Sequence, residues 1–203
     1  AAGYVFWTQL RDAIIRAPRQ DADDCPPETP QCTNSWNRFQ LVNASEDAFI
    51  WGAELQAWAR IPGGFTLLAT IAYAYGEGPN PGEPPTNPEL EWEERVPLSR
   101  IPPLNGVVEL RWNWREAGIF LGAGLRWALD QDRLAINDVA DQRIPGGGTP
   151  GFAVLDLRAG WRLRQNILIS AVFENVTDEV YRYHGSSVNG PARGLILHLE
   201  VGL

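Results

Sequence analysis

Apolar and polar residues alternate with a period of two along most of the chain. This period is typical of strands whose two faces meet different surroundings. In one such stretch Leu155 and Leu157 share a face, while Asp156 and Arg158 share the other. The alternation predicts eight strands, at residues 3–17, 37–61, 65–76, 98–114, 119–131, 152–163, 167–181 and 192–203.

The connections between these strands alternate in length. Three are short enough for tight hairpins: "PGG" after the second strand, "REAG" after the fourth and "RQN" after the sixth. The others, at residues 18–36, 77–97, 132–151 and 182–191, are much longer. In an antiparallel meander this order places every short turn at one rim and every long loop at the other, which is typical of outer-membrane barrels.

Alternation alone leaves the orientation of the apolar face open, because a soluble sandwich or binding barrel buries it and an outer-membrane barrel turns it to lipid. Aromatic residues favour the membrane. They occupy apolar positions near both ends of the strands, as expected for rings at two lipid interfaces. The short-turn rim has Phe65, Trp112, Trp114 and Trp161, and the long-loop rim has Phe49, Trp51, Tyr73, Tyr75, Trp127 and Phe173.

Composition fits this interpretation. Nine Trp, 20 Gly, 16 Pro and 44% hydrophobic residues suit a β-rich chain with many turns rather than a disordered chain or a coiled coil. No apolar run approaches the roughly 18 residues of a membrane helix. The acidic residues behind the net charge of −8 cluster in Pro-rich connections, as in solvated loops, with attraction of cations as the alternative. Nucleic acid is disfavoured as a partner, because no basic patch with interleaved aromatic residues occurs.

Other chemistry is sparse. Cys25 and Cys32 are interpreted as a loop disulfide in an oxidising compartment, with two free thiols as the alternative, since zinc would want further soft ligands nearby. We recognise no nucleophile triad or phosphate loop, so we expect no enzyme, no cofactor and no resident metal. The chain opens within a strand pattern and contains no Met, which suggests a portion of a longer protein.

Three short motifs follow one another along the chain: "G-x-E" at residues 52–54, "R-x-P-P" at 100–103 and "N-x-x-D-x-x-Y" at 175–181. Their order and spacing resemble the C-terminal strands of TonB-dependent outer-membrane receptors. The resemblance implies an all-β, antiparallel up-and-down transmembrane barrel of about 22 strands. Residues 1–203 would supply about eight strands at its C-terminal end. Family barrels commonly finish on an aromatic residue, whereas this sequence ends on Leu203.

The resemblance further implies energy-coupled uptake of a scarce nutrient, of the ferric siderophore, haem or cobalamin type, across the bacterial outer membrane. The implied partners are outer-membrane lipid and lipopolysaccharide, an N-terminal plug with the earlier strands, the inner-membrane TonB complex and a small-molecule metal chelate, with the receptor a monomer. Two alternatives stay open: a complete small eight-stranded outer-membrane protein of structural or adhesive role, and a soluble β-barrel binding module.

Two groups of residues are candidates for function. Charges of both signs on the polar face are interpreted as ion pairs across a wet lumen wall and to the plug, or as part of the substrate path. This lumen set comprises Glu54, Arg60, Glu109, Arg111, Arg126, Asp130, Asp156, Arg158, Arg162, Glu174, His198 and Glu200. A Tyr or His in a long loop suits an iron or haem ligand, and an Arg suits an anionic chelate. These ligand-contact candidates are Tyr181, Tyr183, His184, Arg133, Arg143 and Arg193.

Overall fold

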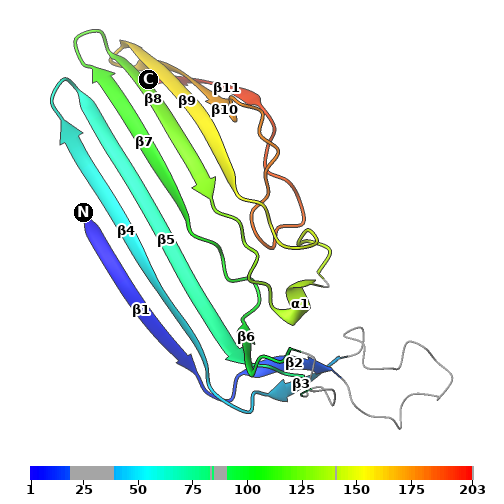
Figure 1. The fold of residues 1–203 in the computed structure, drawn as a ribbon. Helices are drawn as coiled ribbons and strands as arrows, with labels where there is room; N and C mark the ends of the chain where they lie inside the picture. The colour runs from blue at the N-terminus through cyan, green and yellow to red at the C-terminus, as the bar shows by residue number, and fades with distance from the viewer. Residues whose placement is uncertain (19–38, 83, 85–90, 140, 203) are drawn as a thin grey trace.

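The chain folds around one antiparallel sheet, seen in a computed structural model that describes residues 1–18, 39–82, 84, 91–139 and 141–202. The strand order is β1-β4-β5-β7-β8-β9-β10-β11, an up-and-down meander (Figure 1). Its long strands are β1 Ala2–Leu10, β4 Ala48–Ile61, β5 Phe65–Pro79, β7 Asn105–Trp114, β8 Ile119–Ala128, β9 Phe152–Arg164, β10 Ile167–Glu174 and β11 Gly194–Val201. The predicted all-β, antiparallel fold is confirmed, and each of the eight predicted segments contributes one of these strands.

The sheet curves but does not close (Figure 1). β1 and β11 lie at its two ends, and no pairing between them occurs among the described residues. Both end strands therefore present backbone N–H and C=O groups that a further strand would have to pair before the sheet could lie in hydrocarbon. In this form the chain is not the closed small barrel that the sequence left open.

Short turns and long connections lie at opposite ends of the sheet (Figure 1). The short turns join β4 to β5, β7 to β8 and β9 to β10, as predicted. Gly63, Gly64 and Gly118 reverse the chain there with φ of 86°, 88° and 67°, a region that L side chains avoid. The long connections follow β1, β5, β8 and β10, and their described parts gather at the other end.

Two predicted strands are interrupted. Residues 3–17 divide into β1 and β2 (Ile14–Pro18), and residues 37–61 divide into β3 (Phe39–Asn43) and β4. β2 pairs with β3 as a separate two-stranded sheet beside the long connections. Runs of consecutive polar residues, "RD" at 11–12 and "SED" at 45–47, break the alternation at both interruptions, and the two predicted strands were wrongly carried through them.

Three other predicted strands are too long at the long-loop end. β7 begins at Asn105 rather than at residue 98, β8 ends at Ala128, and β10 ends at Glu174. The preceding Pro102 and Pro103 have no N–H to give to a ladder, and Asn175 turns the chain away from β10 with a φ of 47°. Two short elements were not predicted: β6 (Arg95–Pro97), which pairs with β5, and α1 (Ile136–Val139). Within the described residues, no helix has the length and hydropathy to cross a membrane.

Candidate functional site

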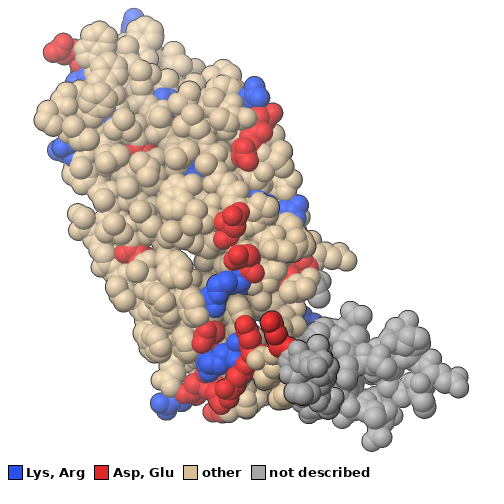
Figure 2. All heavy atoms as spheres, viewed as in Figure 1, with Lys and Arg blue, Asp and Glu red and all other residues tan. Residues whose placement is uncertain are grey.

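Strand register gathers apolar side chains on one face of the sheet. One row runs across the sheet from β4 to β11 as Ala59, Leu67, Leu110, Ala123, Leu157, Phe173 and Leu195. Leu110, Leu157 and Leu195 are well exposed, so these side chains do not pack beneath a second layer of the described structure. In Figure 2 charged side chains are sparse over the strands and gather at the end with the long connections.

Aromatic rings contact one another near both ends of the apolar face. At the short-turn end, the ring centroid of Trp112 lies 6.4 Å from that of Phe65 and 6.1 Å from that of Trp114. Toward the long connections, the ring of Trp51 lies 5.5 Å from the rings of both Tyr73 and Tyr75. Two aromatic bands separated by aliphatic rows match the two interfaces of a bilayer.

The opposite face carries the charged residues predicted for a lumen wall, with one exception. Register places on this face Glu54, Arg60, Glu109, Arg111, Arg126, Asp156, Arg158, Arg162, Glu174, His198 and Glu200. Asp130 is the exception, because it lies beyond the end of β8. There it accepts a hydrogen bond of 2.6 Å from the backbone N–H of Gly151, so its placement on the wall was wrong.

An ion-pair cluster lies midway along this inner face. The Glu109 carboxylate accepts hydrogen bonds from Arg111 of its own strand at 3.0 Å and from Arg158 of β9 at 2.8 Å. The guanidinium of Arg111 also lies 5.6 Å from the ring centroid of Phe120. Two cations therefore share one carboxylate, which fits cross-strand pairing along a wall.

A second cluster joins the wall to the connection after β10. Arg126 donates from Nε and Nη2 to the two carboxylate oxygens of Asp156, at 3.0 and 3.2 Å, and from Nη1 to the hydroxyl of Tyr181 at 3.2 Å. Tyr181 is only 3% exposed and packs on Phe152, with ring centroids 4.8 Å apart. A side chain held in this way supports the wall and is poorly placed to bind a ligand.

The "N-x-x-D-x-x-Y" motif explains how this connection folds back. Asn175 is fully buried, and its backbone N–H donates to Asp156 at 2.9 Å. Its amide Nδ2 donates to the carbonyls of Glu179 and Pro191, and its Oδ1 accepts from the N–H of Glu179. Asp178 accepts from the backbone N–H of Arg193 at 2.9 Å and forms an ion pair with its guanidinium at 3.3 Å. Arg193, a ligand-contact candidate, is thus part of the loop scaffold.

The "R-x-P-P" motif is held by α1. Asp138, 1% exposed, accepts hydrogen bonds from the Ser99 hydroxyl and from the backbone N–H of Arg100. Arg100 adopts a φ of 61°, and its side chain pairs with Asp141 at 3.1 Å. Asp138 lies 38 and 39 residues from its two partners and in a helix too short for a periodic pattern, so sequence reasoning missed it.

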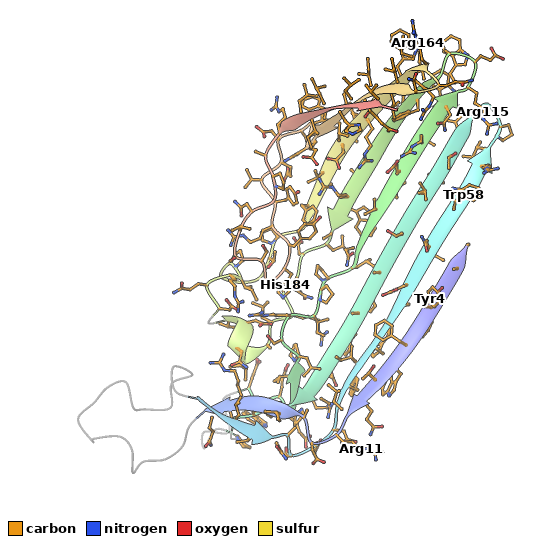
Figure 3. All side chains as sticks on the ribbon, turned by 180° about the vertical axis from the view of Figure 1, so that it is seen from behind. Tyr4, Arg11, Trp58, Arg115, Arg164 and His184 are labelled. Atoms are coloured by element: carbon orange, nitrogen blue, oxygen red, sulfur yellow. The ribbon has the colours of Figure 1, made fainter. Side chains whose placement is uncertain are left out.

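His184 links the same connections and lies among them in Figure 3. Its Nδ1 lies 3.0 Å from the hydroxyl of Thr149, and burial lowers the pKa of the imidazole, as does the nearby Arg100, while Asp138 opposes this. Beside it a mainly apolar cavity of about 270 Å³ is lined by Pro102, Pro103, Trp127, Phe152, Tyr183 and His184, among others. Three connections therefore meet at this histidine.

The remaining candidates lie apart from one another. Tyr183 is half exposed and packs edge-on against Phe152 at 5.2 Å. The guanidinium of Arg133 lies 3.9 Å from the ring centroid of Tyr75, which belongs to the apolar face. Arg143 pairs with Asp141 at 2.6 Å in the connection between β8 and β9. The structure therefore does not bring the six ligand-contact candidates into one site.

The two remaining expectations concern the cysteines and metal binding. Cys25 and Cys32 lie outside the described residues, so their predicted disulfide stays a prediction. Among the residues that are described, no group of three or more His, Cys, Asp or Glu side chains is arranged to hold a metal ion.

An uncovered apolar face between two aromatic bands, a charged inner face and alternating short turns and long connections define a segment of a transmembrane β-barrel. The family model described as "TonB dependent receptor-like, beta-barrel" matches residues 3–176. The chain therefore belongs to this family, and its place is the bacterial outer membrane. Family members are receptors and transporters, so the chain is not an enzyme, and the soluble binding module is excluded.

Solved structures share this fold. The chain is similar to a structure titled "Copper transporter OprC", with a TM-score of 0.68, 21% identity and 98% of this chain covered. It is also similar to the FrpB iron transporter of Neisseria meningitidis (TM-score 0.65, 18% identity, 98% covered) and to the siderophore receptor PiuA of Acinetobacter baumannii (TM-score 0.64, 13% identity, 98% covered). The match spans 28%, 28% and 25% of those chains, respectively. Among curated proteins, no sequence matches the chain.

Proposed function

We propose that residues 1–203 form the C-terminal strands of a larger TonB-dependent receptor that imports a scarce nutrient by energy-coupled uptake. The unpaired edges of β1 and β11 support this, because additional strands would satisfy their backbone groups. The chain also spans about a quarter of the length of the similar solved structures. The remaining strands and an N-terminal plug would belong to the same polypeptide.

The cargo we propose is a metal or its small-molecule chelate, of the ferric siderophore, haem or cobalamin type. The similar solved structures include a copper transporter, an iron transporter and a siderophore receptor, which supports this class without choosing among its members. The ligand is captured by the long connections, signals through the plug to the inner-membrane TonB complex, and passes along the charged inner wall. Lipid and lipopolysaccharide contact the apolar face, and the receptor acts as a monomer.

The observation that carries the proposal is the anchoring of long connections to the inner wall and to one another. Arg126 and Asp156 fix the connection after β10 through Tyr181, and Asp138 fixes the connection after β8 to the turn before β7. A structural or adhesive barrel has no need of loops tied to its interior, whereas a receptor needs a preorganised mouth above its channel.

The proposal is tested in cells that carry the full-length receptor. Uptake of radiolabelled ferric siderophores, haem and cobalamin is compared in cells with and without the receptor, and with and without TonB. We expect one of these ligands to accumulate only when both proteins are present. Accumulation that persists without TonB, or that is unchanged by loss of the receptor for every ligand tried, would exclude the proposed function.

A further inference from the structure

A cavity of about 460 Å³ lies among the long connections, where β2, the end of β5, residues 96–101 and α1 meet. Its volume is in the range of small-molecule binding sites. The residues Arg126, Asp156 and Tyr181, which tie the wall to the connection after β10, do not line it. The cavity is therefore separate from that anchoring network.

The apolar part of the lining is aliphatic. Its large apolar side chains are Ile14, Ile15, Ile50, Val96, Leu98, Ile101 and Ile136. Several prolines complete this surface, and no Phe, Trp or Tyr lines the cavity among the described residues. Flexible alkyl chains pack well on such a surface, whereas an aromatic group gains most from facing rings, which this surface lacks.

The polar part of the lining has three guanidinium groups, those of Arg16, Arg100 and Arg143, and the last two share the carboxylate of Asp141. The other carboxylate in the lining is that of Asp138. Asp141 accepts hydrogen bonds from Arg100 Nη2 at 3.1 Å and from Arg143 Nε and Nη2 at 2.8 and 2.6 Å. The Arg100 and Arg143 side chains are 47% and 42% exposed, whereas that of Asp141 is 15% exposed. Each guanidinium has five N–H donors in a fork that matches a carboxylate, so both can donate hydrogen bonds to a second carboxylate.

We propose that this cavity binds an aliphatic carboxylate, with the alkyl chain against the isoleucine and leucine side chains and the carboxylate on Arg143 and Arg100. The inference rests on the proposed function, since such a group would be an acyl arm of the imported chelate. Asp141 occupies the same two guanidinium groups when the cavity is empty and competes with the ligand. The lining therefore favours one class of cargo, an amphipathic anion rather than a compact, fully polar chelate.

The probe for the test is octanoate, with the full-length receptor in lipid nanodiscs and empty nanodiscs as the measure of partitioning into lipid. Octan-1-ol supplies the chain without the charge, and acetate supplies the charge without the chain. Binding is measured by saturation-transfer difference NMR and by titration calorimetry. We expect octanoate to bind saturably and the two partial probes to bind much more weakly.

Three variants separate binding from damage to the loop. Arg143→Gln removes one cation and should weaken octanoate binding about tenfold. Asp141→Asn keeps the shape of the side chain but removes the competing charge, and should tighten octanoate binding. Arg182→Gln is the matched control, because Arg182 lies in the connection after β10 and does not line the cavity, and this variant should bind octanoate as the wild type does.

Opposite effects of the Asp141 and Arg143 variants support the site, since loss of structure would weaken binding in both. Equal binding by wild type and Arg143→Gln, weaker binding by Asp141→Asn, or octan-1-ol binding as tightly as octanoate would each overturn the inference. Competition by octanoate against TonB-dependent uptake assigns the acyl group to the cargo. If octanoate fails to bind while TonB-dependent uptake is intact, the inference is wrong and the proposed function stands.

Discussion

Arg126 on β8 and Asp156 on β9 form a two-point contact on the inner face, with N–H···O distances of 3.0 and 3.2 Å. The third contact of the guanidinium, to the Tyr181 hydroxyl, lies 55 residues away in sequence. Strand pairing alone would hold Arg126 and Asp156 near each other, but only their side chains extend this order to the connection after β10.

Replacement of Asp156 by Ala should destabilise the receptor. The change leaves the Arg126 guanidinium and the backbone N–H of Asn175 without their acceptor. Because the Arg126 side chain is 27% exposed and partly solvated, we expect a loss of about 2–3 kcal/mol in the free energy of unfolding. Urea unfolding in phospholipid vesicles measures it, with the exposed Glu200→Ala as control. Equal unfolding midpoints for the two variants would contradict this prediction.

Asn175 should tolerate Gly better than Ala. Both substitutions remove the hydrogen bonds of the amide, but only Gly adopts the φ of 47° without strain, a difference of about 1 kcal/mol. Limited proteolysis of the connection after β10 provides the measurement. We expect cleavage to increase in the order wild type, Asn175→Gly, Asn175→Ala. The reverse order of the two variants would show that strain at this position does not matter.

Adjacent residues of β5 test which face meets lipid. Ala69 belongs to the apolar face, whereas Thr70 pairs with Gln56 and Val107 on the inner face. Ala69→Arg should cost about 2–4 kcal/mol in a bilayer, and Thr70→Arg should cost about 1 kcal/mol or less, because its charge reaches water. Heat modifiability on gels and urea titration compare the two. A greater loss for Thr70→Arg would reverse the assignment of the faces.

The contact between Thr149 and His184 should weaken in acid. Burial lowers the pKa of His184 in the folded chain, whereas the pKa of an unfolded His is about 6.5. The unfolded connection therefore binds more protons as the pH falls below about 6.5, so stability is full above this value and declines below it. Proteolysis of this connection should accelerate over that range in wild type, and His184→Gln should respond much less. An identical acid response in the variant would assign the effect to other groups.

The regular part of the fold could be predicted from sequence because a period of two persists along most of the long strands. The prediction failed at the strand ends: the strand predicted at residues 167–181 included Tyr181, yet Tyr181 lies beyond Asn175 in a folded connection. Its burial comes from Phe152 and Arg126, which are distant in sequence. Asp130 was misplaced for the same reason, because the alternation in the sequence does not show where hydrogen bonding between strands stops.

The candidate site was less predictable than the fold. Charges on the inner face followed from alternation, but their pairing depends on register, which sets Glu109 opposite β8 and within reach of Arg158 on β9. No sequence pattern pointed to Asp138 or Asp141. Their hydrogen-bond partners, Ser99, Arg100 and Arg143, lie in irregular segments. Single residues in such segments are defined only by the contacts that tertiary structure creates.

The buried carboxylate of Asp138 restricts how the outer surface of such a receptor can change in length. An insertion between Ala128 and Asp138, or between Arg100 and Asn105, would move the Asp138 carboxylate away from the backbone N–H of Arg100. The buried charge would then lack this hydrogen bond. Stretches outside these anchors have no such constraint. Loop variation among related receptors is therefore expected to concentrate outside residues 100–105 and 128–138, while these two anchored segments keep a fixed spacing to the strands they adjoin.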